Sequence, residues 1–134
     1  MIVVDSSAVA AFILREKGWD KLADYLKRAI TIDHLIKEVS NAIWKATFIH
    51  KYLDVDNALK AFTLLRRLIG KNIIIYPELD YLDKAFHIAL KEGITVYDAL
   101  YIALAHEHKV SLLTLDKKQA SIAKKLGVKV IVIK

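Results

Sequence analysis

The sequence predicts an α/β sandwich built around a parallel β-sheet. Short apolar runs, most of them rich in valine and isoleucine, alternate along the chain with longer segments whose apolar residues recur every three or four positions. Within the short runs, apolar and polar residues do not alternate, which is typical of strands buried on both faces. Strands that alternate with helices are joined by right-handed crossovers, so we expect a doubly wound sheet.

Five apolar runs are the expected strands, at residues 2–4, 29–32, 73–76, 111–115 and 128–133. Apolar stripes with helical spacing indicate helices between them, at residues 35–46, 82–89, 100–104 and 122–126. The chain shows neither an internal repeat nor a low-complexity linker. We therefore expect one compact domain over residues 1–134.

Two consecutive helices, at residues 33–53 and 55–69, are expected between the second and third strands as a helical hairpin that stands on the sheet. Both are apolar over most of their circumference, with large side chains at Trp44, Phe48, Tyr52, Phe62 and Leu65. Such helices need a partner besides their own core, so we expect a two-fold homodimer. The alternative is a monomer in which Trp44 and Phe48 fold back onto the sheet.

Composition and charge limit the classes of protein that fit the chain. No run approaches the roughly 18 uninterrupted apolar residues of a membrane span, and the first residues lack the features of a signal peptide. Because the chain has no cysteine, disulfides and thiolate metal sites are excluded, and we expect a cytoplasmic protein without a membrane partner. The net charge of +6 suits a polyanionic partner, although lysines on solvated helix faces give the same total.

Four acidic residues are candidates for a functional site: Asp5, Glu38, Asp98 and Asp116. Asp5 and Asp116 each follow an expected strand and precede a helix, where a short carboxylate commonly caps the helix. Asp98 lies three residues after Thr95, as in a capping box, or as an acid in the first helical turn. Taken alone, each of these three is more often a cap than a catalyst. Glu38 lies inside a helix, where capping is impossible and a solvated side chain is the ordinary alternative.

The topology of the expected sheet changes this interpretation, because all four carboxylates can meet at one place. In a doubly wound sheet the carboxyl-terminal ends of the strands share one edge, where ligands bind. Converging carboxylates raise one another's pKa, so the site is unfavourable without a cation. Mg²⁺ or Mn²⁺ suits oxygen ligands, and such an ion activates water and stabilises charge on a scissile phosphate. A zinc site is not indicated, since His106 and His108 lie two residues apart on a helix and are expected at the surface.

Four sequence blocks occur in order along the chain with fitting spacing. They are residues 3–7 (VVDSS), 38–42 (EVSNA), 95–105 (TVYDALYIALA), and 113–116 (LTLD) followed by 123–128 (AKKLGV). Together they resemble the PIN-domain nucleases, most closely the VapC-type toxins of prokaryotic toxin–antitoxin pairs, over essentially the whole chain. The third block is the most specific of the four.

This resemblance implies a three-layer α/β/α sandwich with a five-stranded parallel sheet in the order 3-2-1-4-5. It also implies an endoribonuclease that hydrolyses phosphodiester bonds of single-stranded RNA, with Mg²⁺ or Mn²⁺ as cofactor. Members of the family are usually dimers, and a small antitoxin neutralises them by placing its C-terminal segment in a groove near the site. The implied partners are therefore RNA, an antitoxin and a second copy of the chain.

The resemblance also assigns individual residues, and no acidic position of the family pattern is missing. The implied metal site consists of Asp5, Glu38, Asp98 and Asp116. Of these, Asp5 and Asp98 are the expected direct ligands. The implied supporting groups are the hydroxyls of Ser6, Ser7 and Thr114, and the amide of Asn41 as a contact to the substrate or to a ligand residue.

Three other functions compete with this interpretation. The first is a nuclease of RNA processing with the same fold, which a small antitoxin-like reading frame directly upstream would exclude. The second is a non-catalytic binding module that keeps the fold and its caps, but it leaves Glu38 without a task. The third is a phosphatase with Asp5 as nucleophile, but such enzymes require a second aspartate two positions on, where this chain has Ser7.

Overall fold

A computed structural model describes residues 1–133 of the chain, and these residues form a five-stranded sheet in the order β3-β2-β1-β4-β5. All four neighbouring strand pairs are parallel, so the expected topology is confirmed. The strands are β1 (Ile2–Val4), β2 (Ala29–Ile32), β3 (Ile73–Tyr76), β4 (Leu112–Leu113) and β5 (Val130–Ile131).

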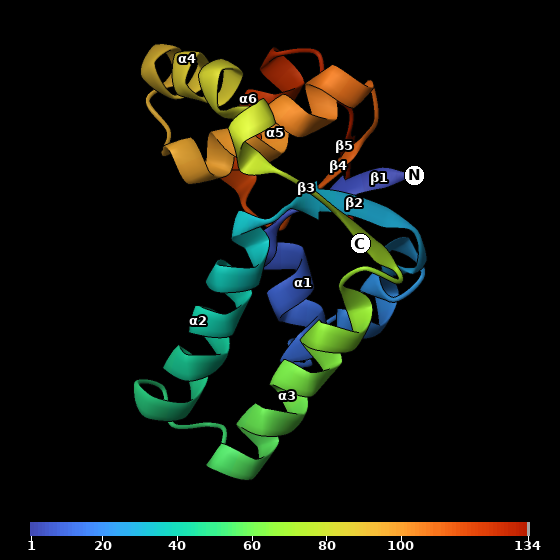
Figure 1. The fold of residues 1–134 in the computed structure, drawn as a ribbon, viewed down its shortest axis with the longest axis vertical. Coiled ribbons are helices and arrows are strands. Elements are labelled where there is room, and N and C mark those ends of the chain that lie inside the picture. The colour runs from blue at the N-terminus through green and yellow to red at the C-terminus, as the bar shows by residue number, and fades with distance from the viewer. Residues whose placement is uncertain (134) are drawn as a thin grey trace.

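Helices cover both faces of the sheet, which gives the expected three layers. In Figure 1, α1, α2 and α3 lie on one side of the strands, and α4, α5 and α6 lie on the other. The helices are α1 (Ser6–Ile13), α2 (His34–Phe48), α3 (Val55–Leu68), α4 (Leu82–Glu92), α5 (Val96–His108) and α6 (Lys117–Lys125). Short 3₁₀ helices are η1 (Trp19–Leu22), η2 (Tyr25–Lys27) and η3 (Glu78–Asp80). Nowhere in residues 1–133 is a helix both long and apolar enough to cross a membrane.

The core is formed by the central strands and the helices packed against them. All residues of β2 and β4 are buried, as expected for parallel strands covered on two faces. Helix α5 is buried without interruption over residues 99–105, because it contacts β1, β2, α4 and α6. A helix enclosed in this way is apolar around most of its circumference.

Some elements are shorter than the apolar runs that predicted them. β4 and β5 each keep two residues of the expected strands at 111–115 and 128–133, and Thr114 leaves the ladder to bond other side chains. Helix α2 ends at Phe48 rather than at residue 53. Its end is fixed because Lys51 adopts a left-handed backbone (φ 57°) and the next two N–H groups bond back to the carbonyl of Ala46.

The two histidines near the end of α5 lie in different environments. His106 is exposed, as expected. His108 is partly buried, since its Nε2 lies 2.7 Å from the Tyr81 hydroxyl and its ring meets that of Tyr76 edge to face at 4.7 Å. The expectation of a surface residue was therefore wrong for His108, which joins α5 to the segment around the end of β3.

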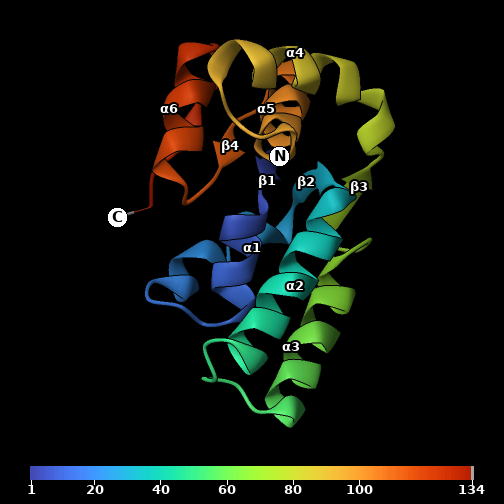
Figure 2. The same ribbon diagram turned by 90° about the vertical axis from the view of Figure 1, so that its left-hand side faces the viewer.

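Helices α2 and α3 form the expected hairpin, which extends away from the sheet in Figure 2. Trp44 and Phe48 are 50% and 59% exposed, so they do not fold back onto the sheet. Leu65 was expected in the exposed apolar surface, but it is fully buried. Ala61 is also buried on α3, and Ala58, Leu64 and Leu68 of the same helix pack, partly buried, against the core.

Leu65 is the large side chain that α3 buries completely, so stability should be sensitive to this position. Leu65→Ala should lower the free energy of unfolding by about 2–5 kcal/mol, because it removes buried surface and leaves a cavity. Lys60→Ala on the same helix is the control: Lys60 is exposed, and its loss should change stability by less than about 0.5 kcal/mol. Urea denaturation followed by circular dichroism measures both, and equal effects would show that α3 does not pack through Leu65.

Candidate active site

Asp5 lies at the carboxyl end of β1, where it caps α1. Its Oδ1 accepts hydrogen bonds from the Ala8 N–H at 3.0 Å and from the Ser7 hydroxyl at 2.7 Å, and its Oδ2 accepts from the Thr114 hydroxyl. The residue is 2% exposed. The capping role does not compete with a role in a site, because the same carboxylate begins α1 and contacts the residue that follows β4.

Burial raises the pKa of Asp5 from its usual value of 3.8 to about 6. The hydrogen bonds from Thr114, Ser7 and Ala8 favour the ionised form and limit this shift, whereas the nearby charge of Asp98 adds to it. The ionised carboxylate is therefore less stable here than in water. A cation beside it would reverse that preference.

Gln119 ties the first turns of α5 and α6 together, although the sequence analysis assigned it no role. Its Nε2 donates to the carbonyl of Asp98 at 3.0 Å, and its Oε1 lies 3.1 Å from the Thr114 hydroxyl. Its backbone N–H donates to Asp116 Oδ1 at 3.0 Å, so Asp116 caps α6 as expected. A glutamine three positions after a capping aspartate fits a capping-box pattern, and this signal could have found the residue.

Asp98 lies at the centre of the electrostatic interactions among the acidic residues. Its backbone N–H donates to the hydroxyl of the expected cap Thr95 at 3.2 Å. Burial raises the pKa of Asp98, and the charges of Asp116 and Glu38 raise it further. Asp98 in turn raises the pKa of Asp5. The carboxylates of β1, α2, α5 and the β4–α6 turn therefore share one edge of the sheet and repel one another.

Glu38 has a structural contact that the sequence did not reveal. Its Oε1 accepts a hydrogen bond of 2.5 Å from the hydroxyl of Tyr101, which is 1% exposed. Burial and the charge of Glu38 raise the pKa of the Tyr101 phenol above its usual range, so the phenol remains a hydrogen-bond donor. A buried tyrosine hydroxyl requires a partner. The argument that a binding module would leave Glu38 without a task was therefore wrong, and Glu38 alone does not distinguish a nuclease from such a module.

The supporting residues differ in how closely they approach the carboxylates. Ser7 bonds Asp5, and its hydroxyl also accepts the Leu115 N–H at 2.9 Å. Ser6 hydrogen-bonds the phenol of Tyr101 and so belongs to the network around Glu38. Asn41 is exposed on α2, and its contact to substrate stays a prediction.

The chemistry of the donors at this edge fits a hard divalent cation, because they are carboxylate and hydroxyl oxygens. Their mutual repulsion also fits a site that a cation stabilises. Within residues 1–133, however, no three histidine, cysteine, aspartate or glutamate side chains form a group that could hold a metal ion. Hydrogen bonds engage both oxygens of Asp5 and one of Glu38. The oxygen atoms of these residues thus suit a divalent cation. In this structure, however, hydroxyl groups of the protein occupy several of them.

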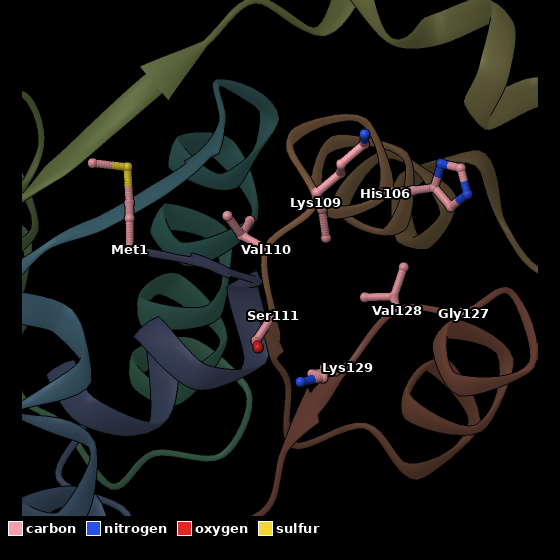
Figure 3. Close-up of a pocket in the computed structure, with 9 residues that line it drawn as sticks. Met1, His106, Lys109, Val110, Ser111, Gly127, Val128 and Lys129 are labelled. Carbon is pink, nitrogen blue, oxygen red and sulfur yellow. The ribbon is translucent and has the colours of Figure 1, made fainter.

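Two grooves lie at opposite edges of the sheet. One, of about 480 Å³, runs beside Asp116 and is lined by Lys117 and Lys124 of α6 and by residues of β5. The other, of about 540 Å³, lies at the amino-terminal edge, between the end of α5 and the start of β5 (Figure 3), and is lined by Lys109 and Lys129 among others. Only the first groove adjoins a candidate acidic residue.

Comparisons with known proteins agree with this fold. The PIN domain family model matches residues 2–125. Ribonuclease VapC3 of Pyrobaculum aerophilum is 35% identical over 124 residues, which cover 89% of this chain and 92% of the relative. Exonuclease VapC9 of the same organism is 31% identical over 117 residues, which cover 87% of this chain and 80% of the relative.

Solved structures share the architecture at lower identity. The crystal structure of PAE2754 from Pyrobaculum aerophilum has a TM-score of 0.72 and 23% identity, covering 96% of this chain and 82% of that one. A toxin–antitoxin complex from Klebsiella pneumoniae has a TM-score of 0.65 and 12% identity, covering 100% and 98%. With the family match over most of its length, the chain belongs to the PIN-domain family and is a VapC-type nuclease within it.

The raised pKa of Asp5 has a consequence for stability in chelator. Between about pH 4 and pH 6 the folded protein holds a proton on Asp5 that the unfolded chain releases, so stability falls as the pH rises through this window. Asp5→Asn removes the buried charge but keeps a good cap. Its free energy of unfolding should exceed that of the parent at pH 7, by up to about 3 kcal/mol, and the difference should vanish near pH 4.

Denaturant titrations from pH 4 to pH 8 in EDTA measure this difference. Asp54→Asn is the matched control, because Asp54 caps α3 by the same hydrogen bond, to the Asn57 N–H at 2.8 Å, but is exposed. The same pH dependence in Asp5→Asn and in the parent would contradict the assignment of a buried charge.

Proposed function

We propose that the protein is a Mg²⁺- or Mn²⁺-dependent endoribonuclease that hydrolyses phosphodiester bonds of single-stranded RNA, and that it is the toxin of a toxin–antitoxin pair. The observation that carries this proposal is the electrostatic interaction of Asp98 with each of Asp5, Glu38 and Asp116. The raised pKa values of Asp5 and Asp98 express the repulsion and burial that a cation would offset. The name of the relative VapC3, a ribonuclease, supports RNA as the substrate.

The four carboxylates would hold the ion, and the chemistry that it would supply there is activation of water and stabilisation of the charge on the scissile phosphate. The chain's own residues orient these ligands. Ser7 and Thr114 fix the Asp5 carboxylate, and Tyr101 fixes Glu38. Gln119 holds the backbone of Asp98 against α6.

Basic side chains beside the acids favour a polyanionic substrate. The charge of Lys118 lowers the pKa of Asp98, so this cation lies towards the site. Lys117 and Lys124 line the groove of about 480 Å³ next to Asp116. Phosphate groups of RNA bind such lysines without regard to sequence. An RNA strand that follows this groove would bring a phosphodiester past the carboxylates.

Internal cleavage is the mode that the position of the site favours. Asp116 is exposed at the edge of the sheet, where an extended strand can lie across the acids without presenting an end. One relative is named an exonuclease, so the mode requires a direct test. A circular RNA provides it, because only an endonuclease cuts a substrate that has no ends.

The nuclease prediction concerns Asp98. The protein should cut single-stranded and circular RNA with Mg²⁺ or Mn²⁺, and EDTA should abolish cutting. Asp98→Asn should lose at least about 100-fold in kcat, because the ion loses a charged ligand, while circular dichroism shows a native fold. Asp83→Asn is the matched control, since Asp83 occupies the first turn of α4 as Asp98 does that of α5. Full activity of Asp98→Asn, or of the parent in EDTA, would refute the proposal.

The toxin role is separable from the nuclease activity. A processing nuclease of the same fold would cut RNA without arresting growth on expression. A toxin should arrest growth, and the product of a small upstream reading frame should reverse the arrest. The Glu38–Tyr101 contact is also compatible with a non-catalytic module. Such a module would bind RNA without cleaving it.

The exposed apolar surface of the hairpin supports a protein partner. We define the hairpin surface as Trp44, Phe48, Tyr52, Leu59 and Phe62, which are between 37% and 60% exposed. Three of these residues, Trp44, Phe48 and Leu59, line a groove of about 220 Å³ together with Val55 of α3. We propose that this surface is covered by a second copy of the chain and by a small antitoxin, in accordance with the similarity to a toxin–antitoxin complex.

The partner prediction concerns the mass of the isolated protein. Burial of apolar surface stabilises association by roughly 25 cal/mol per Å², before the losses of ordering are subtracted. The parent should therefore be a dimer at micromolar concentration by light scattering, and Trp44→Lys should shift it towards the monomer. Leu90→Lys is the matched control on α4, where Leu90 is 70% exposed. A monomeric parent would contradict the dimer and leave the nuclease proposal standing.

A further inference from the structure

A stacked pair of aromatic rings lies beside the carboxylates. The rings of His34, at the start of α2, and Tyr97, in the first turn of α5, are 4.4 Å apart between centroids and inclined by 14°. His34 Nε2 lies 3.8 Å from Glu38 Oε1, and Tyr97 directly precedes Asp98. The stack therefore borders two of the four acidic residues, at the edge of the sheet where the site lies.

The two rings differ in their exposure to solvent. The His34 side chain is 15% exposed, whereas Tyr97 is 56% exposed. His34 covers one face of the Tyr97 ring, so the large exposed area of Tyr97 includes its other face. A tyrosine that served only to join α2 to α5 would be more stable with its ring buried. Here the ring is fixed on one side and open on the other.

We propose that Tyr97 is a stacking platform for an unpaired base of the substrate, with His34 as the positioning residue behind it. The proposal rests on the proposed nuclease function and specifies how the site takes single-stranded RNA. Every base has a π-face that stacks on an aromatic ring, so the contact is tolerant of sequence. Bases of a duplex are already stacked, and the platform therefore selects single strands, whose bases can be splayed out.

The position of the platform connects base binding with the carboxylates. A base stacked on Tyr97 places the backbone of its own nucleotide next to Asp98 and Glu38. From there the strand can continue towards Asp116 and the lysine-lined groove of α6. Base stacking at one end of this path and phosphate contacts at the other would hold one phosphodiester over the acids.

The chain contains a matched control for this pair. His50 and Tyr52, in the loop after α2, also form a stacked His–Tyr pair, with centroids 6.1 Å apart and an inclination of 18°. Tyr52 is 58% exposed, nearly the same as Tyr97. It differs in position, because it lies at the far end of the hairpin from the sheet. A general effect of losing an exposed tyrosine would affect both positions, whereas a platform affects only Tyr97.

The experiment measures binding of a short fluorescent oligoribonucleotide by anisotropy, and of the same oligonucleotide with abasic sites. All binding measurements use protein that carries Asp116→Asn, which we expect to bind RNA without cutting it. In this background Tyr97→Ala should weaken binding of the base-containing strand by roughly 5- to 150-fold, and binding of the abasic strand by much less. Tyr97→Phe should retain the affinity. Tyr52→Ala, measured at a concentration where light scattering gives it the same mass as the parent, should leave it unchanged. A thermal melt confirms that each variant is folded.

Two results would overturn the platform. The first is unchanged binding of the base-containing strand by Tyr97→Ala, and the second is an equal loss on both strands, which would indicate an effect on fold or charge. The cleavage assay without the Asp116 substitution separates this proposal from the nuclease proposal. If both hold, Tyr97→Ala raises KM more than it lowers kcat. Base-dependent binding in a protein that never cuts RNA would refute the nuclease and retain the platform.

Discussion

The burial of the Asp5 carboxylate is the constraint on which the rest of the site depends. A charged group with so little access to water is costly unless polar groups surround it. The chain surrounds it with the first turn of α1 and with hydroxyls from α1 and the end of β4, so one side chain fixes the ends of two strands and the start of a helix. Gln119 extends this network to α5 through the backbone of Asp98. The spacing of the acids is thereby set largely by secondary-structure ends rather than by free side chains.

Local signals in the sequence were sufficient to find the fold and the acidic residues. Parallel strands end at a common edge, and capping residues mark where helices begin, so Asp5, Thr95 and Asp116 could be placed from their neighbours alone. Glu38 and Tyr101 are 63 residues apart, and no spacing rule connects them. The same holds for the stack of His34 on Tyr97, which depends on how α2 and α5 approach one another across the sheet. The positions of the acidic residues could therefore be predicted from the sequence, whereas the contacts that orient their side chains could not.

The hairpin shows a related limit of the sequence. Apolar residues on three sides of a helix predict that it has two partners, but they do not tell which side faces the core. Leu65 and Phe62 lie one turn apart on α3, yet the first is fully buried and the second is 37% exposed. The difference follows from the packing of α3 against α2 and α1, which is a property of the assembled layers. It leaves a continuous apolar surface on the outside of the hairpin.

Three of the four acidic residues contribute to helix starts as well as to the site: Asp5 and Asp116 as caps, and Asp98 as the residue that Thr95 caps. A single base change converts an aspartate codon into an asparagine codon, and asparagine caps a helix as well as aspartate does. For this chain, one mutation that is accessible in a single step would therefore remove charge from the candidate site while preserving the helix start. Lineages under selection to silence the activity would accumulate folded, inert copies. Such copies would still present the hairpin to any binding protein and compete with active copies for it.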